Sequence, residues 1–238
     1  MNNNKINVGI AIYADGANLK EILHLNKFSF IKGFTTNPTL MNQSGVKDYK
    51  RFAIDLLSKI KDKPISFEVF ADDLKNMEIQ AKEIAKWGKN INIKIPITNT
   101  KGKSTIGLIK KLSEENIICN VTAIFTFKQL YTLMKKVGNK KIILSVFAGR
   151  IADTGVDPEI IIKKCSVFLK KYKKAKLLWA STREIYNIFQ AHRSGCQIIT
   201  VPNNLIFKLN NLNKDLELFS KETVEMFYND AKSAGFKI

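Results

Sequence analysis

The chain contains 238 residues, of which 45% are hydrophobic and 25% are charged. This composition is typical of a soluble globular protein, and the length allows a sizeable core. No apolar run approaches the roughly 20 residues that span a bilayer, and the N-terminus lacks the arrangement of a secretory signal, so we expect no membrane partner. Three widely separated cysteines argue against a disulfide framework or a Cys-rich zinc site, and they favour a cytoplasmic location.

The formal net charge is +18, which raises the question of a nucleic-acid partner. The lysines are spread along predicted helical segments such as 163–164 and 170–174, without a dense basic tail or a recognisable binding motif. We therefore predict a solvated lysine-rich surface and no nucleic-acid partner. Anionic small substrates are compatible with this charge. A basic nucleic-acid-binding barrel without catalysis is the alternative from another class of protein.

Short β-branched or apolar runs alternate with amphipathic segments eight times along the chain. The predicted strands are 8–14, 31–36, 65–70, 91–96, 117–123, 141–148, 177–180 and 197–201. The predicted helices are 19–25, 46–60, 74–87, 105–115, 127–137, 158–172, 184–193 and 205–209, followed by a last amphipathic segment at 221–234.

Eight strand–helix units predict an α/β fold, a single (β/α)8 TIM barrel with an additional C-terminal helix. A doubly wound open sheet is the competing architecture, but no Gly-x-Gly-x-x-Gly turn follows the first strand. Because no stretch resembles a linker, we expect one domain over 1–238. The helix at about 221–234 is expected to cover a neighbouring chain or the barrel mouth.

Residues 91–96 place a lysine inside an otherwise apolar strand. Isoleucines at 91, 93 and 95 favour a strand that ends at Pro96, and Lys94 lies between them. A lysine in a covered strand loses much of its hydration, which favours the neutral amine needed for Schiff-base chemistry. An edge strand whose lysine reaches water is the simpler interpretation of these six residues alone.

Polar residues end strand after strand, and the ends of barrel strands are where active sites are built. The set comprises Asp15, Thr35, Asn37, Ser66, Glu68, Lys94, Asn120, Thr122, Ser145, Arg150, Ser181 and Arg183, together with the apolar Phe147, which shares a strand face with Ser145. Individually, Asp15 could cap a helix, Asn37 could be a turn residue, and Ser181 could be a helix cap. Glu68 and Lys94 could form a buried ion pair without chemistry. Their convergence on one mouth favours an active site.

The ordered motifs resemble those of the transaldolase family. They are 14–17 (Ala-Asp-Gly-Ala), 33–40 (Gly-Phe-Thr-Thr-Asn-Pro-Thr-Leu), 66–69 (Ser-Phe-Glu-Val), 93–96 (Ile-Lys-Ile-Pro), 120–122 (Asn-Val-Thr), 145–150 (Ser-Val-Phe-Ala-Gly-Arg) and 180–183 (Ala-Ser-Thr-Arg). The match runs from about residue 8 to about 202, and the length is similar to short-chain transaldolases and fructose-6-phosphate aldolases. The resemblance implies a TIM barrel without a metal or organic cofactor.

The resemblance also implies a role for each site residue. Lys94 would form the Schiff base, Asp15 would take the proton from the C4 hydroxyl, and Glu68 would move protons through a water held with Thr122. Asn37, Asn120 and Ser145 would bind the hydroxyls of dihydroxyacetone, and Thr35 and Phe147 complete the substrate-binding set. The substrate phosphate would be held by Arg150, Ser181 and Arg183.

Two positions distinguish the relatives. Phe147 and Glu68 resemble the transaldolase pattern, whereas the aldolase relatives typically carry tyrosine and glutamine there. The resemblance therefore implies transfer of a dihydroxyacetone unit between sugar phosphates in the pentose phosphate pathway, with release of free dihydroxyacetone by an aldolase as the alternative. Val146 departs from the family, where proline is usual. A ring-based homo-oligomer, such as a pentamer or decamer, is also implied.

Overall fold

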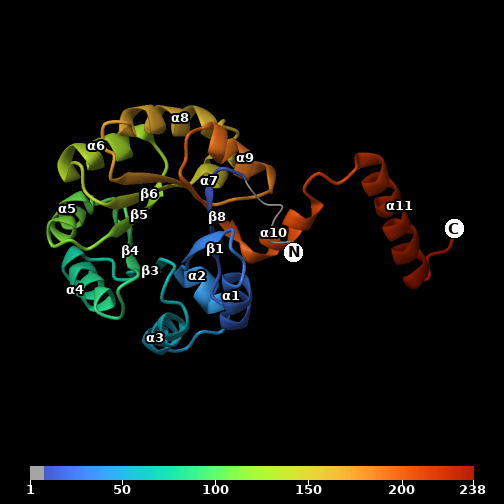
Figure 1. The fold of residues 1–238 in the computed structure, drawn as a ribbon, viewed down its shortest axis with the longest axis horizontal. Coiled ribbons are helices and arrows are strands. Elements are labelled where there is room, and N and C mark those ends of the chain that lie inside the picture. Colours follow the sequence, from blue (N-terminus) through green and yellow to red (C-terminus); the bar gives the residue numbers. More distant parts are fainter. Residues whose placement is uncertain (1–7) are drawn as a thin grey trace.

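The structure is a computed structural model that describes residues 8–238. Eight parallel strands form a closed barrel in sequence order, from β1 next to β2 around to β8 next to β1 (Figure 1). Helices surround the barrel on the outside, as expected when each crossover returns the chain to the same end of a parallel sheet. The predicted (β/α)8 TIM barrel is thus confirmed.

The strands are short, and the helices between them pack on their outer faces. The strands are β1 (Ala11–Asp15), β2 (Ile31–Thr35), β3 (Ile65–Glu68), β4 (Ile91–Pro96), β5 (Cys119–Ile124), β6 (Ile142–Val146), β7 (Ala175–Trp179) and β8 (Ile198–Pro202). The helices are α1 (Leu19–Asn26), α2 (Pro38–Gln43), α3 (Tyr49–Lys59), α4 (Leu74–Ala85), α5 (Ile106–Glu114), α6 (Phe127–Val137), α7 (Ala148–Ala152), α8 (Pro158–Leu169), α9 (Tyr186–Arg193), α10 (Asn203–Phe207), the short 3₁₀ helix η1 (Lys208–Asn211) and α11 (Leu216–Ser233).

The core has two parts. The larger part lies between the strands and the surrounding helices, and it includes Ile93 and Ile95 of β4. The smaller part fills the barrel interior with Tyr13 and residues of β6, β7 and β8. Gly33 is required beside Tyr13, because a Cβ at position 33 would lie 2.7 Å from the tyrosine ring. Alternating residues of each strand therefore face either the helices or the barrel interior.

Two short helices, α2 and α7, were absent from the predicted elements. Asn37 caps α2 by accepting a hydrogen bond from the backbone of Leu40, and Pro38 begins that helix. Helix α7 follows β6 directly, so the predicted strand 141–148 ends earlier, at Val146. The strand runs in register through Val146, where its carbonyl accepts from the backbone of Ala180 at 2.8 Å.

Helix α11 projects away from the barrel at the end of a connecting segment (Figure 1). None of its residues is buried, although its side chains include large apolar groups. The suggestion that this helix covers the barrel mouth of its own chain is therefore wrong. Within the described residues, no helix is both long and apolar enough to cross a membrane.

Candidate active site

A cavity of about 420 Å³ opens at the C-terminal ends of the barrel strands. Twelve of the thirteen strand-end residues line it, namely Asp15, Thr35, Asn37, Glu68, Lys94, Asn120, Thr122, Ser145, Phe147, Arg150, Ser181 and Arg183. Ser66 does not line the cavity, but its hydroxyl accepts a hydrogen bond from Asn120. The strand register explains this meeting, because inward-facing residues at the same level of a closed barrel converge on one mouth.

Lys94 lies in the barrel interior with an acidic neighbour. Its side chain is buried, and the register of β3 against β4 places Glu68 directly opposite. The Nζ atom is 3.0 Å from Glu68 Oε2 and donates a hydrogen bond to the backbone carbonyl of Thr36 at 2.8 Å. The amine is thus held in a fixed direction with a proton acceptor beside it. The edge-strand interpretation of Lys94 is wrong.

A chain of hydroxyl groups orients Asp15. Thr35 donates to Asp15 at 2.7 Å, and the Thr35 and Thr200 hydroxyl oxygens are 2.5 Å apart, so Thr200 must donate to Thr35. Burial raises the pKa of Asp15 above its ordinary value, while the positive charge of Lys94 and the Thr35 hydrogen bond partly offset this rise. A carboxylate with a raised pKa is a stronger base, which suits proton abstraction.

Two amide side chains line the cavity, the buried Asn120 and the partly buried Asn37. Ser145 donates to the Asn120 side-chain oxygen at 2.6 Å, and the Asn120 amide group donates to Ser66 at 3.1 Å. This arrangement fixes which way the Asn120 amide points, because its oxygen already accepts from Ser145. The Asn37 oxygen is occupied by its cap on α2, which leaves its amide N–H groups to contact a ligand.

Thr122 carries a buried hydroxyl that lacks a hydrogen-bond partner among residues 8–238. It lies on β5 opposite Pro96, and it shares the inward face of its strand with Asn120. An unpaired buried hydroxyl costs about 1–3 kcal/mol, so this atom is expected to bind a water molecule or a ligand.

The two arginines approach the cavity from neighbouring connections. A Cβ at Gly149 would lie 1.6 Å from the Ser181 carbonyl oxygen, so only glycine allows α7 to approach this turn. Arg150 of α7 stacks on Phe147, with its guanidinium carbon 5.6 Å from the ring centre. Arg183 pairs with Asp153, and this hydrogen bond, together with the charges of both arginines, lowers the pKa of Asp153.

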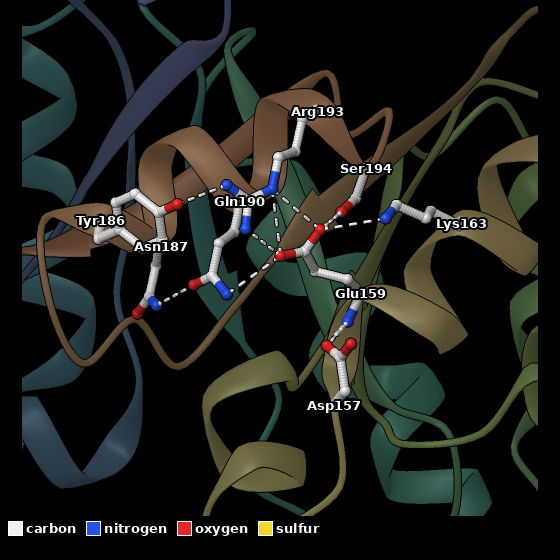
Figure 2. Close-up of polar contacts among 8 residues, drawn as sticks. All are labelled: Asp157, Glu159, Lys163, Tyr186, Asn187, Gln190, Arg193 and Ser194. Carbon is white, nitrogen blue, oxygen red and sulfur yellow. Dashed lines mark hydrogen bonds and ion pairs between the residues drawn. The ribbon is translucent and has the colours of Figure 1, made fainter.

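A buried polar network supports the backbone next to Arg183. The Asn187 oxygen accepts from the backbone N–H groups of Arg183 and Glu184, and its amide group donates to Gln190. Gln190 in turn donates to Glu159 at the start of α8, as Figure 2 shows. The position of the Arg183 backbone is thus linked to the packing of α8 against α9.

Glu159 is the centre of this network (Figure 2). Its carboxylate accepts hydrogen bonds from Arg193 and Ser194, and Lys163 lies 3.3 Å away. The Arg193 hydrogen bonds are the main reason that the pKa of Glu159 falls to about 2. These groups join α8 to α9 and do not line the cavity. They therefore act on the site by holding the Arg183 backbone in place.

The structure differs from the sequence-based expectation at two places around the site. Ser181 and Arg183 were expected at the end of the predicted strand 177–180, but β7 ends at Trp179 and Ser181 lies in a turn with a φ of 64°. Thr200 was not predicted as a site residue, although it lines the cavity and bonds to Thr35. Its signal was a single hydroxyl within the apolar run 198–201.

The fold and the cavity define a TIM barrel with a buried lysine and two carboxylates at the end of the barrel where active sites lie. The family model for transaldolase/fructose-6-phosphate aldolase matches residues 12–238. The chain belongs to this family. Its relatives described as probable transaldolases indicate that it is a transferase enzyme.

Curated relatives agree with this assignment. A probable transaldolase of Dehalococcoides mccartyi is 33% identical over 199 residues, which cover 83% of this chain and 89% of the relative. A probable transaldolase of Thermoanaerobacter sp. is 34% identical and covers 95% of this chain and 99% of the relative. A probable transaldolase 2 of Listeria monocytogenes is 34% identical, with coverage of 83% and 87%.

Solved structures support the fold alone. A putative phosphonomutase from Burkholderia cenocepacia superposes with a TM-score of 0.57 at 8% identity, covering 90% of this chain and 95% of that structure. Orotidine 5'-monophosphate decarboxylase from Metallosphaera sedula gives a TM-score of 0.54 at 11% identity, with coverage of 82% and 89%. At such low identity, these likenesses show a shared barrel architecture.

Proposed function

We propose that the protein is a class I transaldolase, which transfers a dihydroxyacetone unit from a ketose phosphate to an aldose phosphate. The donors would be fructose 6-phosphate or sedoheptulose 7-phosphate in the pentose phosphate pathway, and the location would be the cytoplasm. The observation that carries the proposal is the buried Lys94 amine, held 3.0 Å from Glu68 inside a cavity that Asp15 also lines. The three cysteines are free and buried, in keeping with a reducing compartment.

The first half of the proposed reaction forms and uses a Schiff base. The Lys94 amine attacks the C2 carbonyl of the donor, and the resulting carbinolamine loses water to give an iminium ion. Glu68 moves the protons of this step through a water held with Thr122. The assignment is supported by the Thr122 hydroxyl, which has no hydrogen-bond partner in the described part of the chain. Asp15 then takes the C4 hydroxyl proton as the C3–C4 bond breaks. The electron pair passes to the iminium ion to give a lysine-bound enamine, and C4 leaves as the aldehyde carbon of an aldose phosphate.

The second half reverses this chemistry on another sugar. The lysine-bound enamine attacks the aldehyde carbon of the acceptor, and Asp15 returns its proton to the new hydroxyl group. Asn37, Asn120 and Ser145 would retain the dihydroxyacetone unit in the interval through its hydroxyl groups. Water then releases the product from Lys94. The reaction consumes no oxidant or reductant, because one carbon–carbon bond breaks in the donor and one forms to the acceptor.

The phosphate would be bound by Arg150, Ser181 and Arg183. Guanidinium groups match the geometry of a phosphate dianion and make paired hydrogen bonds to it. The exposed ion pair of Arg183 with Asp153 supports this role, since Arg183 holds only a solvent-exposed anion that a substrate could replace. The proposed reaction requires no cofactor.

Borohydride trapping tests the proposal most directly. After incubation with fructose 6-phosphate and reduction, we expect mass spectrometry to find a reduced dihydroxyacetone adduct on the peptide that carries Lys94. The Lys94→Met variant should lose the adduct, with an unchanged circular dichroism spectrum as the folding control. Absence of an adduct from the folded wild-type protein with several ketose phosphates would refute the assigned chemistry.

A second assay separates transferase from aldolase. With erythrose 4-phosphate as acceptor, a transaldolase forms sedoheptulose 7-phosphate from fructose 6-phosphate. Without an acceptor, accumulation of free dihydroxyacetone would instead identify a fructose-6-phosphate aldolase. Phe147 favours the transferase, because it offers no hydroxyl group to protonate the bound intermediate.

The proposed partners are sugar-phosphate substrates and further copies of this chain, without nucleic acid or membrane. Helix α11 supports self-association, because its exposed side chains include Val224, Met226, Phe227 and Tyr228. Such apolar groups on a projecting helix are typical of an interface that a second copy covers. A ring-based oligomer, such as a pentamer or decamer, is the proposed form.

A further inference from the structure

A second cavity lies at the opposite end of the barrel, at the N-terminal ends of the strands. Its volume is about 790 Å³, and its lining includes Asn92 near the start of β4, Ile142 at the start of β6 and Ile198 at the start of β8. The proposed chemistry makes no use of this end, which in TIM barrels normally serves stability.

Five lysines surround this second cavity, and its lining contains neither aspartate nor glutamate. They are Lys140, Lys141, Lys173, Lys174 and Lys176, all of them exposed. Within residues 8–238, none of the five lies within 4.0 Å of a carboxylate oxygen. By contrast, Lys82 and Lys111 share Glu78 on the outer helices. The lysines at this mouth therefore form a concentrated and uncompensated positive field.

Three buried polar side chains lie in the lining of the second cavity, and those of Tyr13 and Asn92 form its floor. Tyr13 and Asn92 are 8% and 5% exposed, and in the described part of the chain their side chains make no hydrogen bond. Asn92 lies two residues before Lys94 on the same inward face, and Tyr13 lies two residues before Asp15. Burial raises the pKa of Tyr13, so its hydroxyl stays protonated and able to donate. Hydrogen-bond donors thus face the space that the lysines surround.

We infer that this N-terminal mouth binds a small polyanion that carries two or more phosphate groups. The lysines reach the cavity from the two segments 140–141 and 173–176, so a single phosphate would engage only part of the set. A cavity with buried polar side chains in its lining fits a compact ligand, whereas a nucleic acid would require an extended groove along the surface. The inference does not depend on the transaldolase proposal, because the two cavities share no lining residue.

The test is isothermal titration calorimetry of the full chain with inorganic tripolyphosphate, with inorganic phosphate as the weaker comparison. The cavity variant is Lys141→Gln/Lys174→Gln/Lys176→Gln. Its matched control is Lys75→Gln/Lys128→Gln/Lys164→Gln, which removes the same charge from exposed positions on α4, α6 and α8. Tyr13→Phe removes the floor hydroxyl alone, and Arg150→Ala/Arg183→Ala removes the arginines at the other mouth.

We expect the wild-type protein to bind one tripolyphosphate per chain. The affinity should fall about tenfold in the cavity variant, because that variant loses three exposed ion pairs with the ligand. Tyr13→Phe should also weaken binding, while the control triple and the arginine variant should bind like the wild type. Three results would overturn the inference: no binding to the folded wild type, an equal loss in both lysine triples, or loss only in the arginine variant. The second would indicate attraction by net charge, and the third would place the ligand at the active-site mouth.

Discussion

Lys94 combines a buried amine with an acidic neighbour in the barrel interior. A buried ion pair is often no more stable than an apolar pair of similar size, so stability alone gives little reason for Lys94 and Glu68. The backbone carbonyl of Thr36 adds a third contact, which fixes the direction of the amine. A chemical role accounts for this arrangement better than packing does.

Thr122 allows the effect of a catalytic hydroxyl to be separated from stability. Its Oγ1 atom has no hydrogen-bond partner among the described residues, so Thr122→Val removes a buried polar group without breaking a protein hydrogen bond. We expect an unchanged or higher melting temperature and a kcat reduced by roughly 100-fold, the lower end of general acid–base contributions. Thermal unfolding and steady-state assays of the variant measure both.

The control for Thr122→Val is Thr36→Val. The Thr36 hydroxyl donates to the buried carbonyl of Ser66 at 3.0 Å, so its removal should destabilise the protein by about 1–2 kcal/mol. A Thr122→Val protein with wild-type kcat would contradict the proposed water position. So would a loss of stability as large as that of the control.

Asp15 should destabilise the folded protein at neutral pH. Burial raises its folded-state pKa above the ordinary 3.8, so the unfolded chain ionises first as the pH rises, which stabilises the unfolded chain relative to the folded protein. Asp15→Asn keeps an oxygen that can accept from Thr35. We therefore expect this variant to unfold at higher urea concentration at pH 7, to lose this gain below about pH 3.8, and to be inactive.

Asp72→Asn is the control of opposite sign for Asp15→Asn. Hydrogen bonds from Thr100 lower the pKa of Asp72, so ionisation of this group favours the fold. The Asp72→Asn protein should unfold at lower urea concentration than the wild type at pH 7. Urea curves that coincide for Asp15→Asn and the wild type at pH 7 would disprove the expected cost of Asp15.

At the scale of elements, the alternation of short apolar runs with amphipathic segments predicted all eight strands, because buried parallel strands are apolar and short. It also predicted that residues at the strand ends come together, and they line one cavity because the C-terminal ends of parallel strands meet at one mouth. It did not predict α7 or the turn at Ser181. Those depend on the contact of Gly149 with Ser181, which joins two distant segments and leaves no periodic signal.

The network around Glu159 also depends on distant segments. Its partners Gln190, Arg193 and Ser194 are 31 to 35 residues away in the sequence. No local pattern indicates such a pairing, because a glutamate in the first turn of a helix is already explained by the helix dipole. The link from Glu159 to the Arg183 backbone could thus only be found in the structure.

Glu159→Gln should destabilise the protein in a pH-dependent way. The pKa of Glu159 is lowered to about 2, so its ionised form stabilises the fold above the ordinary pKa of 4.5, and this stabilisation is lost as the pH falls toward 2. We expect a loss of roughly 1.5–3 kcal/mol at pH 7, the range for hydrogen bonds to charged groups. The difference from the wild type should shrink between pH 4.5 and 2 in urea unfolding.

Glu114→Gln is the matched control for Glu159→Gln. Glu114 is exposed, and among residues 8–238 it pairs only with Lys110 at 3.6 Å, so its replacement should change stability by at most about 0.5 kcal/mol. Similar stability of both variants at pH 7 would show that the buried network adds little. A difference from the wild type that stays constant down to pH 2 would show that charge is not its cause.

On the scale of the whole molecule, the two ends of the barrel differ in charge. The C-terminal mouth mixes carboxylates, an amine and arginines, whereas the lining of the N-terminal mouth holds lysines without acidic residues. The net charge of +18 indicated a basic surface but not its distribution. Lysines at 140–141 and 173–176 come together only because each segment leads into a neighbouring strand of the closed barrel.

Helix α11 extends away from the barrel and buries no residue, so its folding adds little to the stability of a single chain. We expect a chain that ends at Ser220 to form smaller assemblies than the full chain in light scattering, with the barrel intact by circular dichroism. Phe227→Lys should act in the same direction, because it places a charge among the exposed apolar side chains of α11. Asn229→Lys adds the same charge at a polar position and should leave the mass unchanged. An unchanged mass after truncation would exclude α11 from the interface.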